Sequence, residues 1–173
     1  MSDEKTERLD FSYYLPVNII FGCGKADLAG SLAKKYGERA LIVTGQSSAK
    51  KSGLYDRVAS SLEQSGMSHL LFDKVTQNPL TTTAEEGASL ARENNCDVII
   101  GIGGGSIMDC AKAIAFLAVN KGDINDYIYN RQKSENALPL LLIPTTCGTG
   151  SEGNGFAVLT NPENGDKKSL RCN

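Results

Sequence analysis

Residues 97–118, DVIIGIGGGSIMDCAKAIAFLA, place an apolar run, a glycine cluster and an amphipathic run in immediate succession within a chain of 173 residues. The apolar run predicts a strand, the four glycines between positions 101 and 105 predict a turn, and Ser106 opens a helix. Glycine lets backbone N–H groups approach an anion closely, and the positive end of a helix attracts it. The stretch is therefore typical of a phosphate cradle and predicts a nucleotide or another phosphorylated ligand.

Apolar runs and helical periodicities alternate along the rest of the chain. Each predicted strand is a continuous apolar run, which is typical of a parallel sheet buried on both faces. We predict an α/β fold with a Rossmann-like, doubly wound, mainly parallel sheet and helices on both faces, in one domain spanning 1–173. The expected strands are 40–44, 69–72, 97–102 and 138–143, and the expected helices are 25–36, 54–64, 81–94 and 106–119.

The N-terminal segment 11–21, FSYYLPVNIIF, alternates and is rich in aromatic and β-branched residues. This pattern predicts a β-hairpin that opens the domain at the edge of the sheet, where Pro16 is tolerated. An exposed edge strand pairs readily with another chain, so a homodimer through this hairpin could form.

Composition excludes several classes of function. The net charge is −2 with scattered Lys and Arg, which is no footprint for nucleic acid. No apolar run reaches the length of a membrane span, and residues 1–10 lack the apolar core of a signal peptide. Five cysteines without a CxxC motif indicate reduced thiols. We expect a cytoplasmic protein without a nucleic-acid or membrane partner.

Three loops rich in small polar residues follow predicted strands, at 44–48, 103–106 and 145–152. In parallel sheets, ligands bind beyond the carboxyl ends of the strands, so these loops should converge on one crevice. Hydroxyl groups in the third loop can bond ribose hydroxyls, phosphate oxygens or an amide.

The glycine motif alone does not name the ligand. It matches neither GxGxxG nor the Walker pattern. Ser106 and Asp109 have a structural alternative, because they are spaced as a capping-box-like pair at a helix N-terminus. Three adjacent glycines exceed what capping requires and favour close approach by a ligand.

The end of the 40–44 strand bears on the choice of coenzyme. Dinucleotide folds often place an acidic residue there to bind the ribose 2′-hydroxyl, and this chain has Gly45. Hydroxyls and lysines nearby could accept a 2′-phosphate, which favours NADP over NAD. The alternative is a plain surface loop.

No complete reaction centre is evident in the sequence. Cys147 has no activating base, because His69 is the only histidine and lies in an apolar strand. His69 also has no neighbours at metal-ligand spacing. We therefore expect no catalytic residue and no metal site in this chain.

Two long motifs resemble those of the iron-dependent (group III) alcohol dehydrogenases. GGGSIMDCAK at 103–112 resembles that family's GGGSxxDxAK signature, and IPTTCGTGSE at 143–152 is similar to its IPTTxGTGSE segment. Weaker likenesses at 16–24, 78–79 and 160–168 occur in the family's order, so the resemblance runs from about Pro16 to the end.

The resemblance implies a set of coenzyme-binding residues. Residues 103–106 would hold the pyrophosphate, Asp109 would lie near the nicotinamide, and three threonines would line the adenosine and ribose part. Gly45 matches a position where NAD-preferring members carry Asp, which strengthens the expectation of NADP, with NAD as the other candidate. Together with the loop after the 40–44 strand, the resemblance gives the candidate coenzyme-binding residues Gly45, Gln46, Ser47, Asn78, Gly103, Gly104, Gly105, Ser106, Asp109, Thr145, Thr146, Thr149, Val158 and Lys168.

The resemblance also has a gap. That family binds its metal through one Asp and three His on a helical C-terminal domain, and none of these ligands is matched here. The chain is thus expected to be the N-terminal cofactor-binding part of a two-domain protein that transfers hydride between NAD(P) and an alcohol or aldehyde. Fe²⁺ or Zn²⁺ would belong to the full-length protein only, and this chain alone should be inactive.

Other readings remain open at this point. A glycerol dehydrogenase-like or dehydroquinate synthase-like relative, or a freestanding nucleotide-binding module, would share the glycine motif. Gly153 and Asn154 depart from the Val-Thr that usually follows Ser-Glu in the family.

Overall fold

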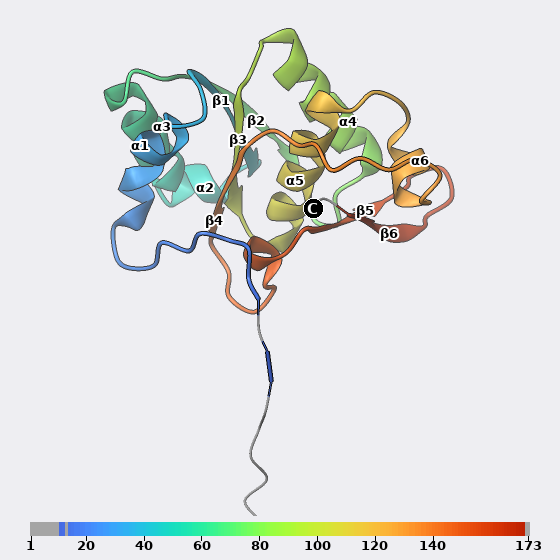
Figure 1. Ribbon diagram of the computed structural model, residues 1–173. Helices are drawn as coiled ribbons and strands as arrows, with labels where there is room; N and C mark the ends of the chain where they lie inside the picture. Colours follow the sequence, from blue (N-terminus) through green and yellow to red (C-terminus); the bar gives the residue numbers. More distant parts are fainter. Residues whose placement is uncertain (1–10, 13, 172–173) are drawn as a thin grey trace, which may run out of the picture.

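The computed structural model describes residues 11–12 and 14–171, and its centre is a four-stranded parallel sheet in the order β2-β1-β3-β4 (Figure 1). A separate antiparallel pair, β5 and β6, lies beside the sheet. All three pairings within the sheet are parallel, so the predicted parallel α/β architecture is confirmed. The strands are β1 Arg39–Gly45, β2 Ser68–Val75, β3 Val98–Gly103, β4 Leu140–Pro144, β5 Phe156–Thr160 and β6 Lys167–Arg171.

Helices cover both faces of the sheet, as predicted. Side chains alternate along each strand, so Ile42 and Ile100 pack toward α1, α2 and α3, whereas Leu41 and Ile99 pack toward α4 and α5. Each face thus buries a core of its own. The helices are α1 Ala29–Ala33, α2 Ser48–Lys51, α3 Leu54–Gln64, α4 Thr81–Glu93, α5 Gly105–Val119 and α6 Ile124–Ile128, with a 3-10 turn at Lys25–Leu28.

Helix α5 lies at the centre of the packing and contacts β3, α4 and β5. Ten of its fifteen residues are buried, which explains why its sequence is apolar on nearly every side. Burial raises the pKa of the Cys110 thiol to about 12, so this group is a neutral core side chain at physiological pH. The helix is therefore held from several directions at once.

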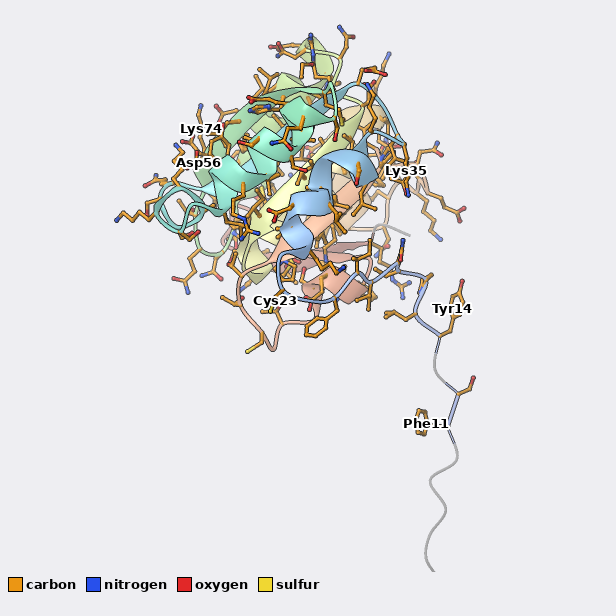
Figure 2. All side chains as sticks on the ribbon, turned by 90° about the vertical axis from the view of Figure 1, so that its left-hand side faces the viewer. Phe11, Tyr14, Cys23, Lys35, Asp56 and Lys74 are labelled. Carbon is orange, nitrogen blue, oxygen red and sulfur yellow. The ribbon has the colours of Figure 1, made fainter. Side chains whose placement is uncertain are left out.

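The predicted N-terminal hairpin is wrong. Residues 11–12 and 14–21 form no strand, and Figure 2 shows Phe11 and Tyr14 projecting from the body of the molecule. Phe11, Tyr14 and Phe21 are 79%, 84% and 94% exposed. Alternation favours an extended backbone, but a strand also needs a hydrogen-bonding neighbour, and the pattern cannot supply one.

The antiparallel pair forms instead at β5 and β6, which the sequence pattern did not predict. Only one of the five residues of β6, Leu170, is buried, so the strand has no apolar run to reveal it. Helix α6 was likewise not predicted, and it begins at Asp123, whose carboxylate accepts a hydrogen bond from the Asn125 N–H.

Close packing of α1 on α3 depends on Gly30. The Gly30 N–H donates to Ser61 Oγ, and a Cβ at this position would lie 1.9 Å from the Ser61 carbonyl oxygen. Gly30→Ala should therefore lower the free energy of unfolding by about 3 kcal/mol, because the two helices must separate. Urea unfolding measures this, with Gly153→Ala as the control, since its Cβ would make an ordinary 3.5 Å contact with Leu15. Equal stability of the two variants would contradict the packing account.

Glu85 on α4 produces a pH dependence of stability. Desolvation first, and then repulsion from Asp123 and Glu163, raise its pKa above 4.5 in the folded protein. The free energy of unfolding should therefore fall as the pH rises from 4.5 through the folded pKa, because the folded state holds the proton more tightly.

Replacing this carboxyl tests the effect. Glu85→Gln should be more stable than the wild type at pH 7 and lose that advantage near pH 4. The gain should be below about 1 kcal/mol, because Glu85 is only half-buried and solvent screens the repulsion. Thermal unfolding at both pH values measures it. Glu86→Gln, which breaks an exposed ion pair with Lys74, is the control and should change stability little. A gain that is the same at both pH values would contradict the assignment.

Candidate functional site

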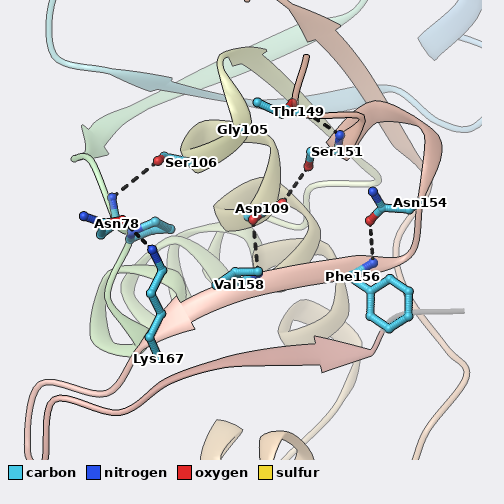
Figure 3. Close-up of a pocket in the computed structure, with 11 residues that line it drawn as sticks. Asn78, Gly105, Ser106, Asp109, Thr149, Ser151, Asn154, Phe156, Val158 and Lys167 are labelled. Carbon is cyan, nitrogen blue, oxygen red and sulfur yellow. Dashed lines mark hydrogen bonds between the residues drawn. The ribbon is translucent and has the colours of Figure 1, made fainter. Parts of the chain in front are cut away.

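A cavity of about 420 Å³ opens at the carboxyl end of β3 (Figure 3). It lies between the start of α5, the loop after β2, the loop after β4 and the β5–β6 pair. Strand β1 has β2 on one side and β3 on the other, so the chain reverses its direction of winding between β1 and β3. Open α/β sheets bind ligands at such switch points. The lining residues are Asn78, Pro79, Gly105, Ser106, Asp109, Thr149, Ser151, Asn154, Phe156, Val158 and Lys167.

The N-terminus of α5 faces this cavity without a side-chain cap. The helix begins at Gly105, and its N-cap residue is Gly104, which has no side chain to accept a hydrogen bond. The N–H groups of Gly105 and Ser106 have no acceptor within the helix, because they belong to its first turn. Ser106 Oγ instead accepts a hydrogen bond of 3.3 Å from the Asn78 N–H. The capping-box alternative for Ser106 and Asp109 is therefore wrong.

The glycines of the motif have two different tasks. Gly103 is buried beneath the helix, where a Cβ would lie 2.4 Å from Ile107 Cγ1. Gly104 and Gly105 face the loop after β4, and Cβ atoms there would lie 3.0 Å from Thr146 Oγ1 and 3.1 Å from Thr149 Cγ2. The last two glycines therefore let the loop lie close to the uncapped end of α5.

Asp109 joins α5 to the far wall of the cavity. Its Oδ1 accepts a hydrogen bond of 2.6 Å from Ser151 Oγ, and its Oδ2 accepts one of 3.1 Å from the Val158 N–H (Figure 3). Lys112 Nζ lies 3.3 Å from the same Oδ1. This carboxylate thus fixes the short 3-10 helix Ser151–Gly153 and strand β5 against α5.

The opposite side of the cavity is closed by Asn78 and Lys167. Asn78 adopts a left-handed backbone conformation, with φ of 54°, and its Oδ1 accepts a hydrogen bond of 2.7 Å from Lys167 Nζ. A backbone hydrogen bond from Thr160 to Pro79 ties β5 to the same loop. The cavity walls therefore come from segments about 90 residues apart in the sequence.

Lys168, which the resemblance implied, is absent from the cavity lining, where its neighbour Lys167 is found. Lys168 Nζ lies 4.3 Å from the centre of the Tyr129 ring and pairs with Asp166. Successive residues of a strand point to opposite faces. When Lys167 points into the cavity, its neighbour Lys168 therefore points away from it. Contact of Lys168 with a coenzyme remains a prediction.

The other implied residues fall into three groups: those that line the cavity, those next to it, and those outside it. Asn78, Gly105, Ser106, Asp109, Thr149 and Val158 line the cavity, and Thr145, Thr146 and Gly104 lie next to it around the start of α5. Gly45, Gln46 and Ser47 lie at the end of β1, outside the cavity lining. The loops at 103–106 and 145–152 do converge, because the Thr145 N–H donates to the Gly103 carbonyl.

Five residues of the cavity lining are absent from the set predicted from the sequence. Ser151 lies within the quoted GTGSE segment, and Pro79 follows the predicted Asn78, so a signal existed for these two. The other three come from the β5 and β6 region, which no pattern predicted as strands. They are Asn154, Phe156 and Lys167.

No group of three or more His, Cys, Asp or Glu residues that could hold a metal ion occurs in the part of the chain that the structure describes. His69 lies on β2, where its ring makes an edge contact with Tyr55 at 6.5 Å between centroids. Among residues 11–12 and 14–171, no helix is long and apolar enough to cross a membrane.

The fold and the place of the cavity are typical of nucleotide-binding α/β proteins. Residues 16–173 match the model of the family described as "Iron-containing alcohol dehydrogenase", which narrows the class of protein. This chain belongs to the iron-containing alcohol dehydrogenase family.

Similar proteins include dehydrogenases named for NAD or NADH. NADH-dependent butanol dehydrogenase A of Clostridium acetobutylicum is 40% identical over 159 residues, which cover 92% of this chain and 41% of that protein. NAD-dependent methanol dehydrogenase of Bacillus methanolicus is 33% identical over 149 residues, 86% of this chain and 39% of that protein. The chain therefore spans about two fifths of the length of these relatives.

Solved structures agree with this likeness. The crystal structure of NADH-dependent butanol dehydrogenase A from Thermotoga maritima has a TM-score of 0.88 at 34% identity, covering 94% of this chain and 41% of that chain. Sulfoacetaldehyde reductase from Bifidobacterium kashiwanohense, solved in complex with NAD⁺, has a TM-score of 0.86 at 31% identity, covering 95% of this chain and 44% of that chain.

The hydrogen bonds of Asp109 should make it important for stability. Asp109→Asn places an NH₂ donor where a carboxylate oxygen now accepts hydrogen bonds, so the variant should lose about 2 kcal/mol of unfolding free energy. Urea unfolding measures the loss. Asp27→Asn, which breaks an exposed ion pair with Arg57, is the matched control and should change stability little. A loss no larger than the control's would contradict the role of Asp109 as a joint between α5 and β5.

Proposed function

We propose that this chain forms the coenzyme-binding part of a nicotinamide-dependent alcohol dehydrogenase and binds the coenzyme diphosphate at the N-terminus of α5. The observation that carries the proposal is the uncapped first turn of α5, which opens into a cavity at the switch point of the sheet. Backbone N–H groups and the helix dipole together favour an anion there.

The residues around this helix end fit a diphosphate. Gly104 and Gly105 have no Cβ to obstruct the N–H groups, and Ser106 Oγ lies in the lining as an additional donor. Thr146 and Thr149 lie beside the same glycines and carry further hydroxyls. The site thus offers neutral hydrogen-bond donors, and the first turn of α5 carries no carboxylate.

A dinucleotide that places its diphosphate here has two directions in which to extend. One leads toward the carboxyl end of β1, where Gly45, Gln46 and Ser47 would border the adenosine and ribose. The other leads into the cavity between α5 and β5, where Asp109 and Val158 would border the nicotinamide half. A bound nicotinamide supplies hydride transfer at C4 of its ring.

The end of β1 favours NADP as the coenzyme. Gly45 leaves room for a phosphate, since a Cβ there would still lie 3.4 Å from its nearest neighbour, the Val75 carbonyl oxygen. Ser47, Ser48 and Lys51 are exposed close by, whereas Lys50 is held by Asp73, whose pKa this hydrogen bond lowers. NAD, the coenzyme in the names of several relatives, is the other candidate.

The names of the relatives suggest an alcohol or aldehyde as the substrate of the whole protein. The chain's own residues would bind and orient the coenzyme for hydride transfer to or from the carbon that bears oxygen. Among the described residues, no group of His, Cys, Asp or Glu could hold the iron for which the family is named.

Titration of the chain with NADPH and with NADH tests both parts of the proposal. We expect both coenzymes to bind and NADPH to bind more tightly, as measured by fluorescence of the reduced nicotinamide. If neither coenzyme binds, the proposed function is overturned. If NADH binds more tightly than NADPH, the NADP preference is overturned.

Gly45→Asp should weaken NADPH about tenfold or more and affect NADH less, because a carboxylate would repel the 2′-phosphate. Ser60→Asp, on an exposed position of α3, adds the same charge away from the site and should change neither affinity. An equal loss for both coenzymes in Gly45→Asp would contradict the placement of the adenosine ribose.

A further inference from the structure

Lys112 is the one buried charged side chain among residues 11–12 and 14–171, with a side-chain exposure of 3%. It lies on α5 one turn after Asp109, which lines the cavity, and is itself absent from the lining. Burying an ammonium group is costly unless the group is paired and hydrogen-bonded. Its place on the buried part of α5 therefore calls for a role beyond filling space.

The ammonium group of Lys112 forms hydrogen bonds with the backbone at the start of β5. Lys112 Nζ donates to the Phe156 carbonyl at 2.6 Å and to the Asn154 carbonyl at 3.2 Å. It also lies 3.3 Å from Asn154 Oδ1 and from Asp109 Oδ1. Acceptors from α5 and from the chain entering β5 thus surround one cation.

Asn154 extends this arrangement in both directions along the chain. Its Nδ2 donates to the Gly150 carbonyl at 2.7 Å, and its Oδ1 accepts from the Phe156 N–H at 2.9 Å (Figure 3). Lys112 and Asn154 together therefore fix the turn between the loop after β4 and strand β5.

The residues fixed in this way form one wall of the cavity. Asn154, Phe156 and Val158 all line it, and the Val158 N–H is bonded to Asp109. The distance between β5 and α5 determines the width of the cavity, and both Lys112 and Asp109 bridge these two elements. Movement of β5 would widen the nicotinamide half while leaving the N-terminus of α5 unchanged.

We propose that Lys112 is a positioning residue for the nicotinamide half of the coenzyme, acting through Asn154 and Phe156 without touching the coenzyme. The inference rests on the proposed function and deepens it. It separates two parts of one site: the diphosphate and adenosine part depends on α5 and the loops, and the nicotinamide part depends on the buried cation.

A methionine at this position would nearly match the volume of Lys112 but would leave the carbonyl oxygens of Asn154 and Phe156 without their donor. An arginine would keep the charge but cannot place its planar donors as an ammonium group does. The two substitutions therefore distinguish the charge from its geometry.

The experiment measures binding of NADPH and of ADP to the 173-residue chain and to its variants. ADP carries the diphosphate and adenosine but no nicotinamide. Lys112→Met should weaken NADPH about tenfold or more, because β5 loses its fixed position. It should change ADP affinity by no more than about twofold, because ADP has no nicotinamide half to meet the wall at β5 that Lys112 fixes. Lys112→Arg should recover part of the loss for NADPH.

Asn154→Ala provides a second variant, since Lys112→Met removes a buried charge and could prevent folding. It removes Oδ1 and should shift the NADPH to ADP affinity ratio in the same direction and less strongly. Ser61→Ala is the control for stability, because Ser61 is buried on the opposite face of the sheet and bonds Gly30. It should lower stability and leave the ratio unchanged.

The possible outcomes are distinguishable. An unchanged ratio in Lys112→Met and Asn154→Ala, with wild-type binding of both ligands, overturns the inference and leaves the proposed function intact. A parallel loss of both ligands shows a general structural role and also overturns it. A wild-type chain that binds neither ligand overturns the proposed function and this inference with it.

Discussion

The close contact between α5 and β3 is the constraint on which the rest of the structure depends. It requires glycine at two positions of β3, because a Cβ at Gly101 would lie 2.8 Å from Ala111 Cβ and one at Gly103 would lie 2.4 Å from Ile107. With larger residues at these two positions, the helix could not start directly at the edge of the sheet. The first N–H groups of α5 have no side-chain cap, and this close packing directs them toward the cavity.

The remaining walls are placed relative to this helix by a few polar contacts. Asp109 holds β5 and Ser151, Ser106 holds Asn78, and Lys167 reaches Asn78 from β6. Each contact joins segments far apart in the sequence. The cavity is therefore a product of tertiary structure, in which the glycine motif supplies one side only.

These origins explain how much the sequence could predict. The buried strands and the long helices follow from local apolar patterns, so β1, β3, β4, α3 and α5 lie close to their expected positions. Helix 25–36 was expected as one piece and instead forms a 3-10 turn and the short α1, ending at Ala33. The N-terminal hairpin failed because alternation favours an extended chain without providing a partner strand.

The candidate site likewise has a part that the sequence predicts and a part that only the tertiary structure reveals. The start of α5 and the loop after β4 could be found from motifs, because their chemistry lies in consecutive residues. Lys167, Asn154 and Phe156 belong to an exposed strand pair whose polar sequence hides both its register and its contacts. The expected Lys168 was one residue away from the side chain in the cavity, and only the strand register reveals this.

The amide signals of Gly105 and Ser106 give the most direct test that the uncapped end of α5 receives the diphosphate. Titration with ADP, followed by ¹H–¹⁵N spectra of the labelled chain, should shift these two signals more than those of the other amides in α5. Shifts confined to other parts of the chain, with Gly105 and Ser106 unmoved at saturation, would contradict the account.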